Sequence, residues 1–264
     1  MTALVALTVV VSSFAEGKKT VCIGTFSSGS NVNSSDVTAL RNSILTGLDA
    51  TGRLELTDIN ALNVGKSQEA QINAASEAGC TYLLNGTVNT VTETNKKNND
   101  KTQYSCSISY TLQVTEVGTQ KIFSTDTFTA SWSTGETKSE AMAKAINAAS
   151  SAMKRYVNNT FKTLAAIKSL EDVDKKKGAK TAYVGVGSGA GIQKGQRFDI
   201  FKEIDVAGSK GRKLIGAAKA QEVVGEDLTL VSITKGGKEI QEAFEQGATL
   251  IVETRATITL FDKL

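Results

Sequence analysis

One short motif in the sequence combines residue types that could support nucleophilic catalysis. Ser151 and Lys154 have the S-x-x-K spacing of serine acyl-enzymes. The S-D-N and K-T-G motifs that accompany it in those enzymes are absent. Met153 belongs to the apolar stripe of a long predicted helix. We therefore interpret the motif as part of that helix and not as a catalytic site.

A second pattern is a run of glycines at Gly185, Gly187, Gly189 and Gly191, which could indicate a nucleotide-binding loop. A dinucleotide fingerprint needs G-x-G-x-x-G opening a helix within a β-α-β unit. Here the glycines are spaced by two and the chain continues into another predicted strand. A Walker A loop would end in lysine followed by serine or threonine, which is also absent. We interpret these residues as turn glycines.

The sequence contains no histidine and no proline. Without histidine the chain can supply neither a Ser-His-Asp or Cys-His nucleophile nor an imidazole ligand for a metal. No D-x-D-x-D-G calcium motif occurs, and no acidic pair suggests glycosidase carboxylates. We predict that the protein is not an enzyme, and that it has no catalytic, cofactor-binding or metal-binding residues.

The overall composition is that of a globular protein. Of the 264 residues, 40% are hydrophobic and 22% charged, which suffices for one large or two ordinary domains. The 30 basic and 27 acidic residues leave a net charge of only +3. A near-neutral chain of this kind lacks the excess of positive charge that is typical of nucleic-acid-binding proteins, so we expect no nucleic-acid partner.

The N-terminal run indicates export. Residues 2–11 are strongly apolar, and Ser13-Phe14-Ala15 has the small-x-small pattern of a signal-peptidase site. We predict a cleaved signal peptide at residues 1–15 and a periplasmic or envelope-associated protein. A buried N-terminal strand is the alternative. No basic residue precedes the run, so the natural start could lie upstream of Met1. Cys22 is not preceded by a lipobox, and we expect no lipid anchor there.

The three cysteines, Cys22, Cys80 and Cys106, are widely spaced and odd in number. An odd count in an exported chain leaves at least one free thiol. Because Cys22 and Cys106 lie in strand-like patterns, we expect buried structural thiols. A bridge between Cys80 and Cys106 is the alternative.

Residues 16–168 are predicted to form one α/β domain. Helices are predicted from Ser34 or Ser35, from Ser67, and from Thr137 or Ser139, the last with an apolar stripe reaching Leu164. The predicted strands cover residues 20–26, 54–59, 80–94, 104–115 and 121–133. The last three should form an antiparallel meander, with a polar turn at residues 95–101. We therefore predict a mixed sheet covered by helices.

The strand at residues 104–115 shows unusually regular alternation. Tyr104, Cys106, Ile108, Tyr110, Leu112 and Val114 fall on one side, and serine, threonine and glutamine fall on the other. Such a period of two predicts one face in the core and one in water. In the next strand, Phe128, Ala130 and Trp132 are expected to share a face.

The residue pattern changes after residue 168. Residues 169–182 contain acids followed by lysines and are predicted to be a solvated linker; a basic or acidic binding patch is the alternative. Residues 183–264 contain five short strand-like runs separated by glycine turns. This spacing predicts a small β-barrel-like domain, so the fold class is α+β.

Two motifs carry a resemblance to a known family. The strand Cys80–Val88 (CTYLLNGTV) and the strand end Leu112–Thr119 (LQVTEVGT) resemble motifs of the CsgG-type periplasmic domain, found in curli secretion and in lipoprotein activators of penicillin-binding proteins. The resemblance covers roughly residues 19–165. Residues 189–200 (GAGIQKGQRFDI) are similar to the small C-terminal β-domain of flagellar-assembly periplasmic proteins.

The resemblance implies a periplasmic accessory or assembly protein that binds other envelope proteins, as a ring or another homo-oligomer. The expected contact surfaces are the sheet edges and the groove between the domains. The strand at residues 103–115 lacks the lipid-facing apolar band and aromatic girdle of an outer-membrane strand, so we expect no stable membrane insertion. The alternatives are an outer-membrane secretion-pore subunit and a hydrolase that uses carboxylates or a Ser-Lys pair.

Overall fold

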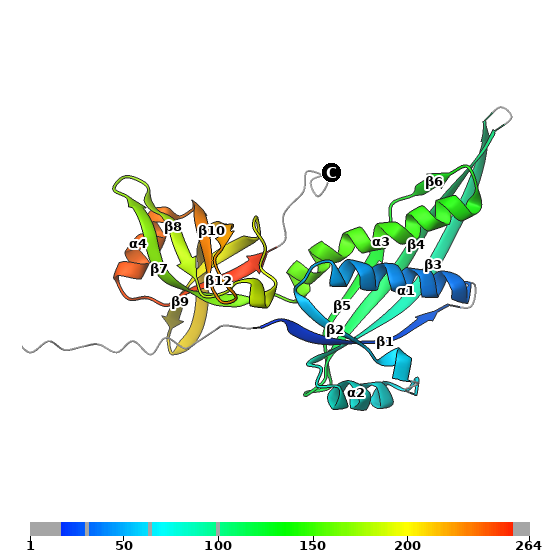
Figure 1. The fold of residues 1–264 in the computed structure, drawn as a ribbon, viewed down its shortest axis with the longest axis horizontal. Coiled ribbons are helices and arrows are strands. Elements are labelled where there is room, and N and C mark those ends of the chain that lie inside the picture. The colour runs from blue at the N-terminus through cyan, green and yellow to red at the C-terminus, as the bar shows by residue number, and fades with distance from the viewer. Residues whose placement is uncertain (1–16, 30–31, 63–64, 99–100, 256–264) are drawn as a thin grey trace, which may run out of the picture. The chain divides into compact units, whose positions relative to one another are not determined.

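The computed structural model describes residues 17–29, 32–62, 65–98 and 101–255. The predicted signal peptide at residues 1–15 lies outside this part of the chain. The chain divides by its contacts into two units, Lys18–Lys162 and Thr163–Arg255. The predicted α+β class is confirmed, because the first unit is a helix-covered mixed sheet and the second a closed barrel (Figure 1).

The sheet of the first unit has the order β2-β1-β3-β4-β5, with β6 also paired to β4. β1 pairs in parallel with β2 and β3, whereas β3, β4 and β5 form the predicted antiparallel meander. The β3–β4 hairpin continues through residues 95–97, where we expected a turn, and its last pair is Asn98–Lys101. The strand bounds are β1 Lys19–Ser28, β2 Leu54–Asp58, β3 Tyr82–Asn98, β4 Lys101–Glu116, β5 Lys121–Thr129 and β6 Ser133–Gly135.

Helices α1 (Ser34–Asp49) and α3 (Lys138–Thr160) lie side by side on one face of this sheet (Figure 1). They pack closely at Gly47, where a Cβ atom would overlap the carbonyl oxygen of Ser150. Their buried faces meet the apolar side of β4, as its alternation predicts. The largest fully buried side chains of this core include Leu40, Ile44, Leu48, Ile108, Leu112 and Met153.

Side-chain hydrogen bonds mark both ends of α3, one from a local cap and one from a residue distant in the sequence. Thr137 Oγ1 accepts a hydrogen bond from the Glu140 N–H at 3.1 Å, which confirms the predicted N-cap. At the other end, buried Arg53 donates to Asn158 Oδ1 at 2.7 Å and to the Phe161 carbonyl at 2.8 Å. The helix therefore stops at Thr160, and the predicted stripe is too long, because Leu164 begins a strand of the second unit.

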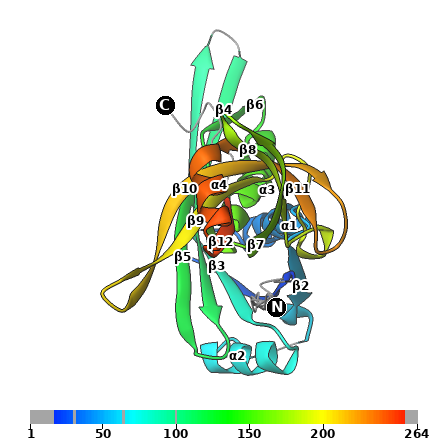
Figure 2. The same cartoon turned by 90° about the vertical axis from the view of Figure 1, so that its left-hand side faces the viewer.

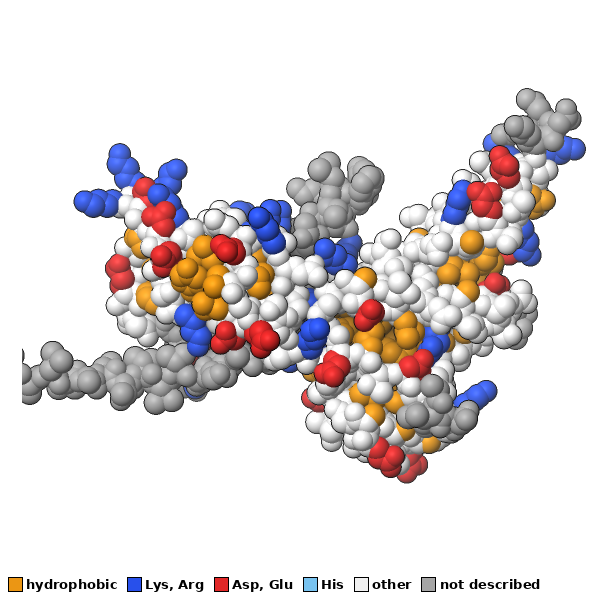
Figure 3. All heavy atoms as spheres, viewed as in Figure 1, with side chains coloured by type: hydrophobic (Ala, Val, Ile, Leu, Met, Phe, Trp, Pro, Cys, Tyr) orange, Lys and Arg blue, Asp and Glu red, His pale blue; other side chains and the backbone are white. Residues whose placement is uncertain are grey.

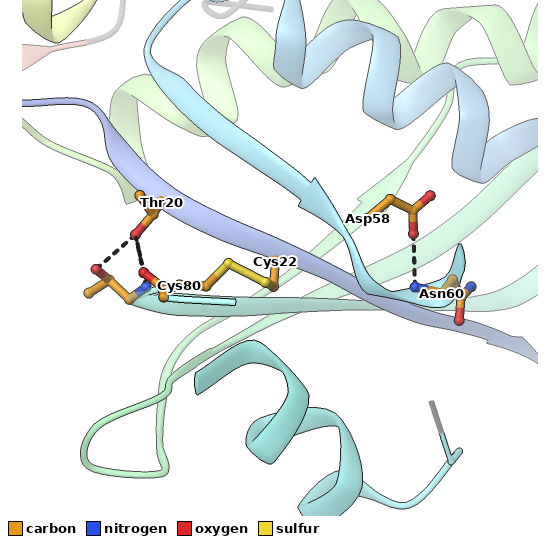
Figure 4. The surroundings of a disulfide bond; sticks show 7 residues. Thr20, Cys22, Asp58, Asn60 and Cys80 are labelled. Carbon is orange, nitrogen blue, oxygen red and sulfur yellow. Dashed lines mark hydrogen bonds between the residues drawn. A yellow bond between two sulfur atoms is a disulfide. The ribbon is translucent and has the colours of Figure 1, made fainter. Parts of the chain in front are cut away.

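The expectation of buried structural thiols is confirmed for Cys106 but wrong for Cys22 and Cys80, and the alternative Cys80–Cys106 bridge is also wrong. Cys22 and Cys80 form a disulfide with a Cα–Cα distance of 5.7 Å (Figure 4). The two meet because β1 and β3 pair in parallel, with Val21 opposite Tyr82. Cys106 stays free and buried; it lies opposite Glu93 of β3, whereas Cys80 precedes that strand.

The disulfide lies in a second apolar cluster on the opposite face of the sheet. Helix α2 (Gln68–Glu77) and the 3-10 helix η1 (Ile59–Leu62) cover only this end of that face. The predicted N-cap of α2 is confirmed, since Ser67 Oγ accepts from the Ala70 N–H. The cluster consists of Cys22, Ile59, Ile72, Ala75, Cys80, Leu83 and Val117.

The second unit is a six-stranded closed barrel in the order β10-β11-β8-β7-β12-β9. Its strands are β7 Leu164–Asp174, β8 Gly178–Val184, β9 Arg197–Val206, β10 Ser209–Val223, β11 Thr229–Lys235 and β12 Leu250–Arg255. The barrel also contains helix α4 (Gly237–Glu245) and the 3-10 helix η2 (Ser188–Ala190). The β9–β10 hairpin extends from the barrel (Figure 2).

The linker expected at residues 169–182 is instead part of the barrel. Those residues form most of the β7–β8 hairpin, in which Leu170 lies opposite Ala182. Asp174 Oδ1 accepts hydrogen bonds from the N–H groups of Lys176 and Lys177, so the charged run is the turn of a hairpin. Figure 3 shows the lysines and acids gathered at this hairpin tip. The passage between the units lies at Lys162 and Thr163.

Candidate functional site

The S-x-x-K motif does not form a site. Ser151 and Lys154 are exposed on α3, whereas Met153 between them is fully buried. Within the described residues, no group of three or more cysteine, aspartate or glutamate side chains gathers closely enough to hold a metal ion. In the same residues, no helix combines the length and apolar character needed to cross a membrane.

The glycine run forms a packed turn. Gly187 precedes η2, and a Cβ atom there would overlap the carbonyl oxygen of Gly225. The N–H groups of Ser188 and Gly189 donate to the carbonyls of Gly225 and Glu226 at 2.9 Å. These glycines therefore allow two loops of the barrel to approach each other.

The first candidate surface is the free side of β5, which we call the β5 edge. Among the described residues, β5 pairs only with β4. The Ala130 N–H donates to the Ile108 carbonyl beside the Ser109–Thr129 pair. Alternation in an antiparallel ladder then directs the N–H groups of Thr125, Thr127 and Thr129 away from β4. These groups are available to another strand.

One end of the β5 edge is apolar. The side chains of Ile122 and Phe123 are 61% and 46% exposed. Phe123 is held from behind by Tyr82, whose ring centroid lies 4.9 Å away, and by Phe161 at 6.3 Å. An anchored but partly open aromatic ring can pack against a partner with little loss of side-chain entropy.

Trp132 does not share a buried face with Phe128, contrary to our expectation. Phe128 stacks on Tyr110 with a centroid distance of 5.0 Å, but Trp132 is 53% exposed. Trp132 lies between β5 and β6, where the ladder is interrupted, so strict alternation does not extend to it. Nearby, Ser107 Oγ donates to the Ala130 carbonyl at 2.7 Å.

The second candidate surface is the sheet face opposite α1 and α3, beyond the end that α2 covers. Register places only serine, threonine, asparagine and glutamine there, and we call it the hydroxyl face. One row crosses four strands, with Ser27 opposite Thr87, Thr87 opposite Thr111, and Thr111 opposite Thr127. The face comprises Ser27, Asn85, Thr87, Asn89, Thr90, Thr92, Thr94, Ser105, Ser107, Ser109, Thr111, Gln113, Thr125, Thr127 and Thr129.

Hydrogen bonds order the centre of the hydroxyl face. The side-chain oxygens of Thr111 and Thr127 are 2.9 Å apart, and those of Ser27 and Thr87 are 3.2 Å apart. Asn89, at a register shift in β3, donates from Nδ2 to Thr111 Oγ1 at 3.0 Å. Each hydroxyl has capacity for further bonds, because it can donate once and accept twice.

A small pocket of about 220 Å³ lies at the distal part of the sheet. Lys138 Nζ and Glu93 Oε2 form an ion pair of 2.7 Å at its wall, and Cys106 also lines it. Burial, and then the nearby Glu93 carboxylate, raise the pKa of the Cys106 thiol, which donates to Met142 Sδ at 3.6 Å. A protonated, buried thiol is a poor nucleophile, so this pocket shows no activated group.

The sequence matches no protein family, and it matches no curated protein. Solved structures with partial similarity include the LpoB C-terminal domain from Salmonella enterica, at 12% identity over 43% of this chain and 82% of that chain, with a TM-score of 0.30.

Two further solved structures overlap to a similar extent. A PelC dodecamer from Paraburkholderia phytofirmans is 16% identical over 52% of this chain and 89% of that chain, with a TM-score of 0.31. A minor lipoprotein from Acinetobacter baumannii is 14% identical over 53% and 91%, with a TM-score of 0.32. At these TM-scores the similarities bear on neither the function nor the partner of this chain, and the CsgG-type resemblance stays a prediction.

Proposed function

We propose that this protein is a non-catalytic accessory or assembly factor of the bacterial cell envelope, exported to the periplasm, which acts by binding another envelope protein. The observation that supports this proposal is the β5 edge. Unpaired strand edges recruit further strands, and binding by strand addition uses main-chain hydrogen bonds with flanking apolar contacts. The β5 edge offers both, through its free N–H groups and through Ile122 and Phe123.

The contrast with the other strands strengthens this argument. The second unit is a closed barrel, an arrangement that leaves no edge strand. At the opposite side of the sheet, β2 spans only Leu54–Asp58, whereas β5 spans Lys121–Thr129. Asp126 is half-buried on the inner side of β5, and an inward charge of this kind disfavours indiscriminate pairing at an edge.

In-cell photo-crosslinking tests the proposal. A photoreactive residue at Ile122 should capture one envelope protein, or a second copy of this chain. The same residue at Val224, which is 52% exposed in the other unit, should not capture it. Thr125→Pro removes an N–H that faces away from β4 and should abolish the product, whereas Thr125→Val should keep it.

Equal capture from both positions, or a product unchanged by Thr125→Pro, would contradict strand addition at β5. Light scattering of the purified mature chain then separates the two kinds of partner, because a homo-oligomer would appear without any other protein.

A further inference from the structure

The composition of the hydroxyl face departs from that of an ordinary solvated sheet. The chain is 22% charged, and β3, β4 and β5 themselves carry charged residues, including Glu93, Lys96, Glu116 and Asp126. Register places Glu93 and Asp126 on the other face and Glu116 beyond one end of the hydroxyl face. Lys96, opposite Gln103, follows Thr94 on the same side and limits the uncharged region at the distal end of the hairpin. A solvated face requires no such exclusion of charge, since lysine and glutamate are common exposed residues.

The geometry gives these groups a regular spacing. Neighbouring strands lie about 4.8 Å apart, and side chains on one face recur at about 6.8 Å along a strand. The row of Ser27, Thr87, Thr111 and Thr127 therefore presents four hydroxyl groups in one line across the sheet. Bonds from Asn89 and between Thr111 and Thr127 hold this line in place before any ligand arrives.

The lack of charge determines which ligand complements this face. An ionic group bound there would lose hydration without gaining a counter-charge, and an apolar surface would leave the hydroxyl groups without hydrogen-bond partners. An uncharged ligand rich in hydroxyl groups avoids both penalties, because each of its groups donates and accepts as threonine and asparagine do.

We propose that the hydroxyl face binds an uncharged polysaccharide. The row of hydroxyl groups crosses four strands, which suits a polymer that lies across several of them. This inference does not depend on the protein partner proposed for the β5 edge, because it rests on side chains and not on free backbone groups.

Affinity electrophoresis tests the inference with three neutral polymers, namely a soluble β-1,3-glucan, dextran and galactomannan, and with dextran sulfate as a charged comparison. At least one neutral polymer should retard the full chain, with a dissociation constant obtained from the dependence on polymer concentration. Failure of all three neutral polymers, or retardation by dextran sulfate alone, overturns the proposal.

Variants localise the binding. Thr127→Val and Thr87→Val remove one hydroxyl each with little change in shape, and each should weaken binding about 3- to 10-fold. Thr127→Glu should weaken it further, because the charge is buried against neutral groups. Ser151→Glu is the matched control, since it adds the same charge on exposed α3.

Thermal unfolding followed by circular dichroism shows that each variant is folded before its binding is measured. Equal retardation of Thr127→Glu and Ser151→Glu would place any binding elsewhere and overturn the proposal.

Discussion

Arg53 Nη1 donates to Asn158 Oδ1 at 2.7 Å, joining the segment before β2 to the last turn of α3 across 105 residues of sequence. Both side chains are buried, and Arg53 also donates to the Phe161 carbonyl. Burial lowers the pKa of Arg53 to about 10, yet the group stays charged at neutral pH. A cation at this position complements the negative end of the helix.

We predict that Arg53→Met destabilises the first unit by about 2–4 kcal/mol, because two buried acceptors lose their charged donor. Arg212→Met is the comparison, since Arg212 is more exposed and its pair with Glu253 is 3.9 Å long. It should change stability by less than about 0.5 kcal/mol. Urea unfolding measures both, and similar losses in the two variants would contradict this assignment.

Reduction of the Cys22–Cys80 bond should destabilise the first unit by about 4 kcal/mol, because the bond closes a loop with a sequence separation of 58. Urea unfolding with and without reductant measures the loss. Thiol titration in denaturant checks the pairing itself. It should find one thiol, Cys106, before reduction and three after it. Three thiols in protein purified without reductant would contradict the disulfide.

Gly47→Ala should destabilise the first unit by about 1–3 kcal/mol, although alanine has a helix propensity about 1 kcal/mol better than glycine. The new Cβ atom would overlap the Ser150 carbonyl and push α1 and α3 apart. Gly118→Ala is the control, because a Cβ atom there meets nothing within 4 Å. A Gly47→Ala protein as stable as the control would show that α1 and α3 can move apart without loss of stability, and would contradict the prediction.

Alkaline pH should destabilise the first unit through Tyr110 and Tyr156. Burial raises the pKa of both phenols above the ordinary value of 10. Their contribution to stability is therefore complete below pH 10 and decreases as pH rises further, since the unfolded state ionises first. Arg53 acts in the opposite sense, because its pKa is lowered and loss of its proton relieves the burial penalty from about pH 10 upward.

Urea unfolding between pH 8 and pH 11.5 measures the net effect of these groups. Tyr156→Phe should make the fall of stability above pH 10 shallower, because phenylalanine cannot ionise. An identical pH dependence in the variant would contradict the assignment to Tyr156.

Much of the local structure was predictable because local residues determine it. The caps at Ser67 and Thr137 act on N–H groups three residues away, and the alternation from Tyr104 to Val114 directly reports the two faces of β4. The α+β class followed from these elements.

Features that depend on pairing between distant segments were not predictable. The Cys22–Cys80 bond depends on the parallel register of β1 with β3, which no sequence spacing encodes. The β7–β8 hairpin was mistaken for a linker because its charged turn outweighed the short apolar run that precedes it.

The candidate surfaces were only partly visible in the sequence. One side of β4 was identified as polar, but the row from Ser27 to Thr127 requires the register of four strands, including the shift beside Asn89. The openness of β5 depends on which strands lack a second neighbour, a property of the assembled sheet alone.

The chemistry of the hydroxyl face also decides how contacts made there can be detected. None of its side chains is an amine, a carboxylate or a thiol. Reagents aimed at those groups, including the usual lysine and cysteine cross-linkers, would therefore leave a ligand seated on this face unrecorded. Deuterium uptake by the backbone of β3 and β4, or footprinting with hydroxyl radicals, would report it directly.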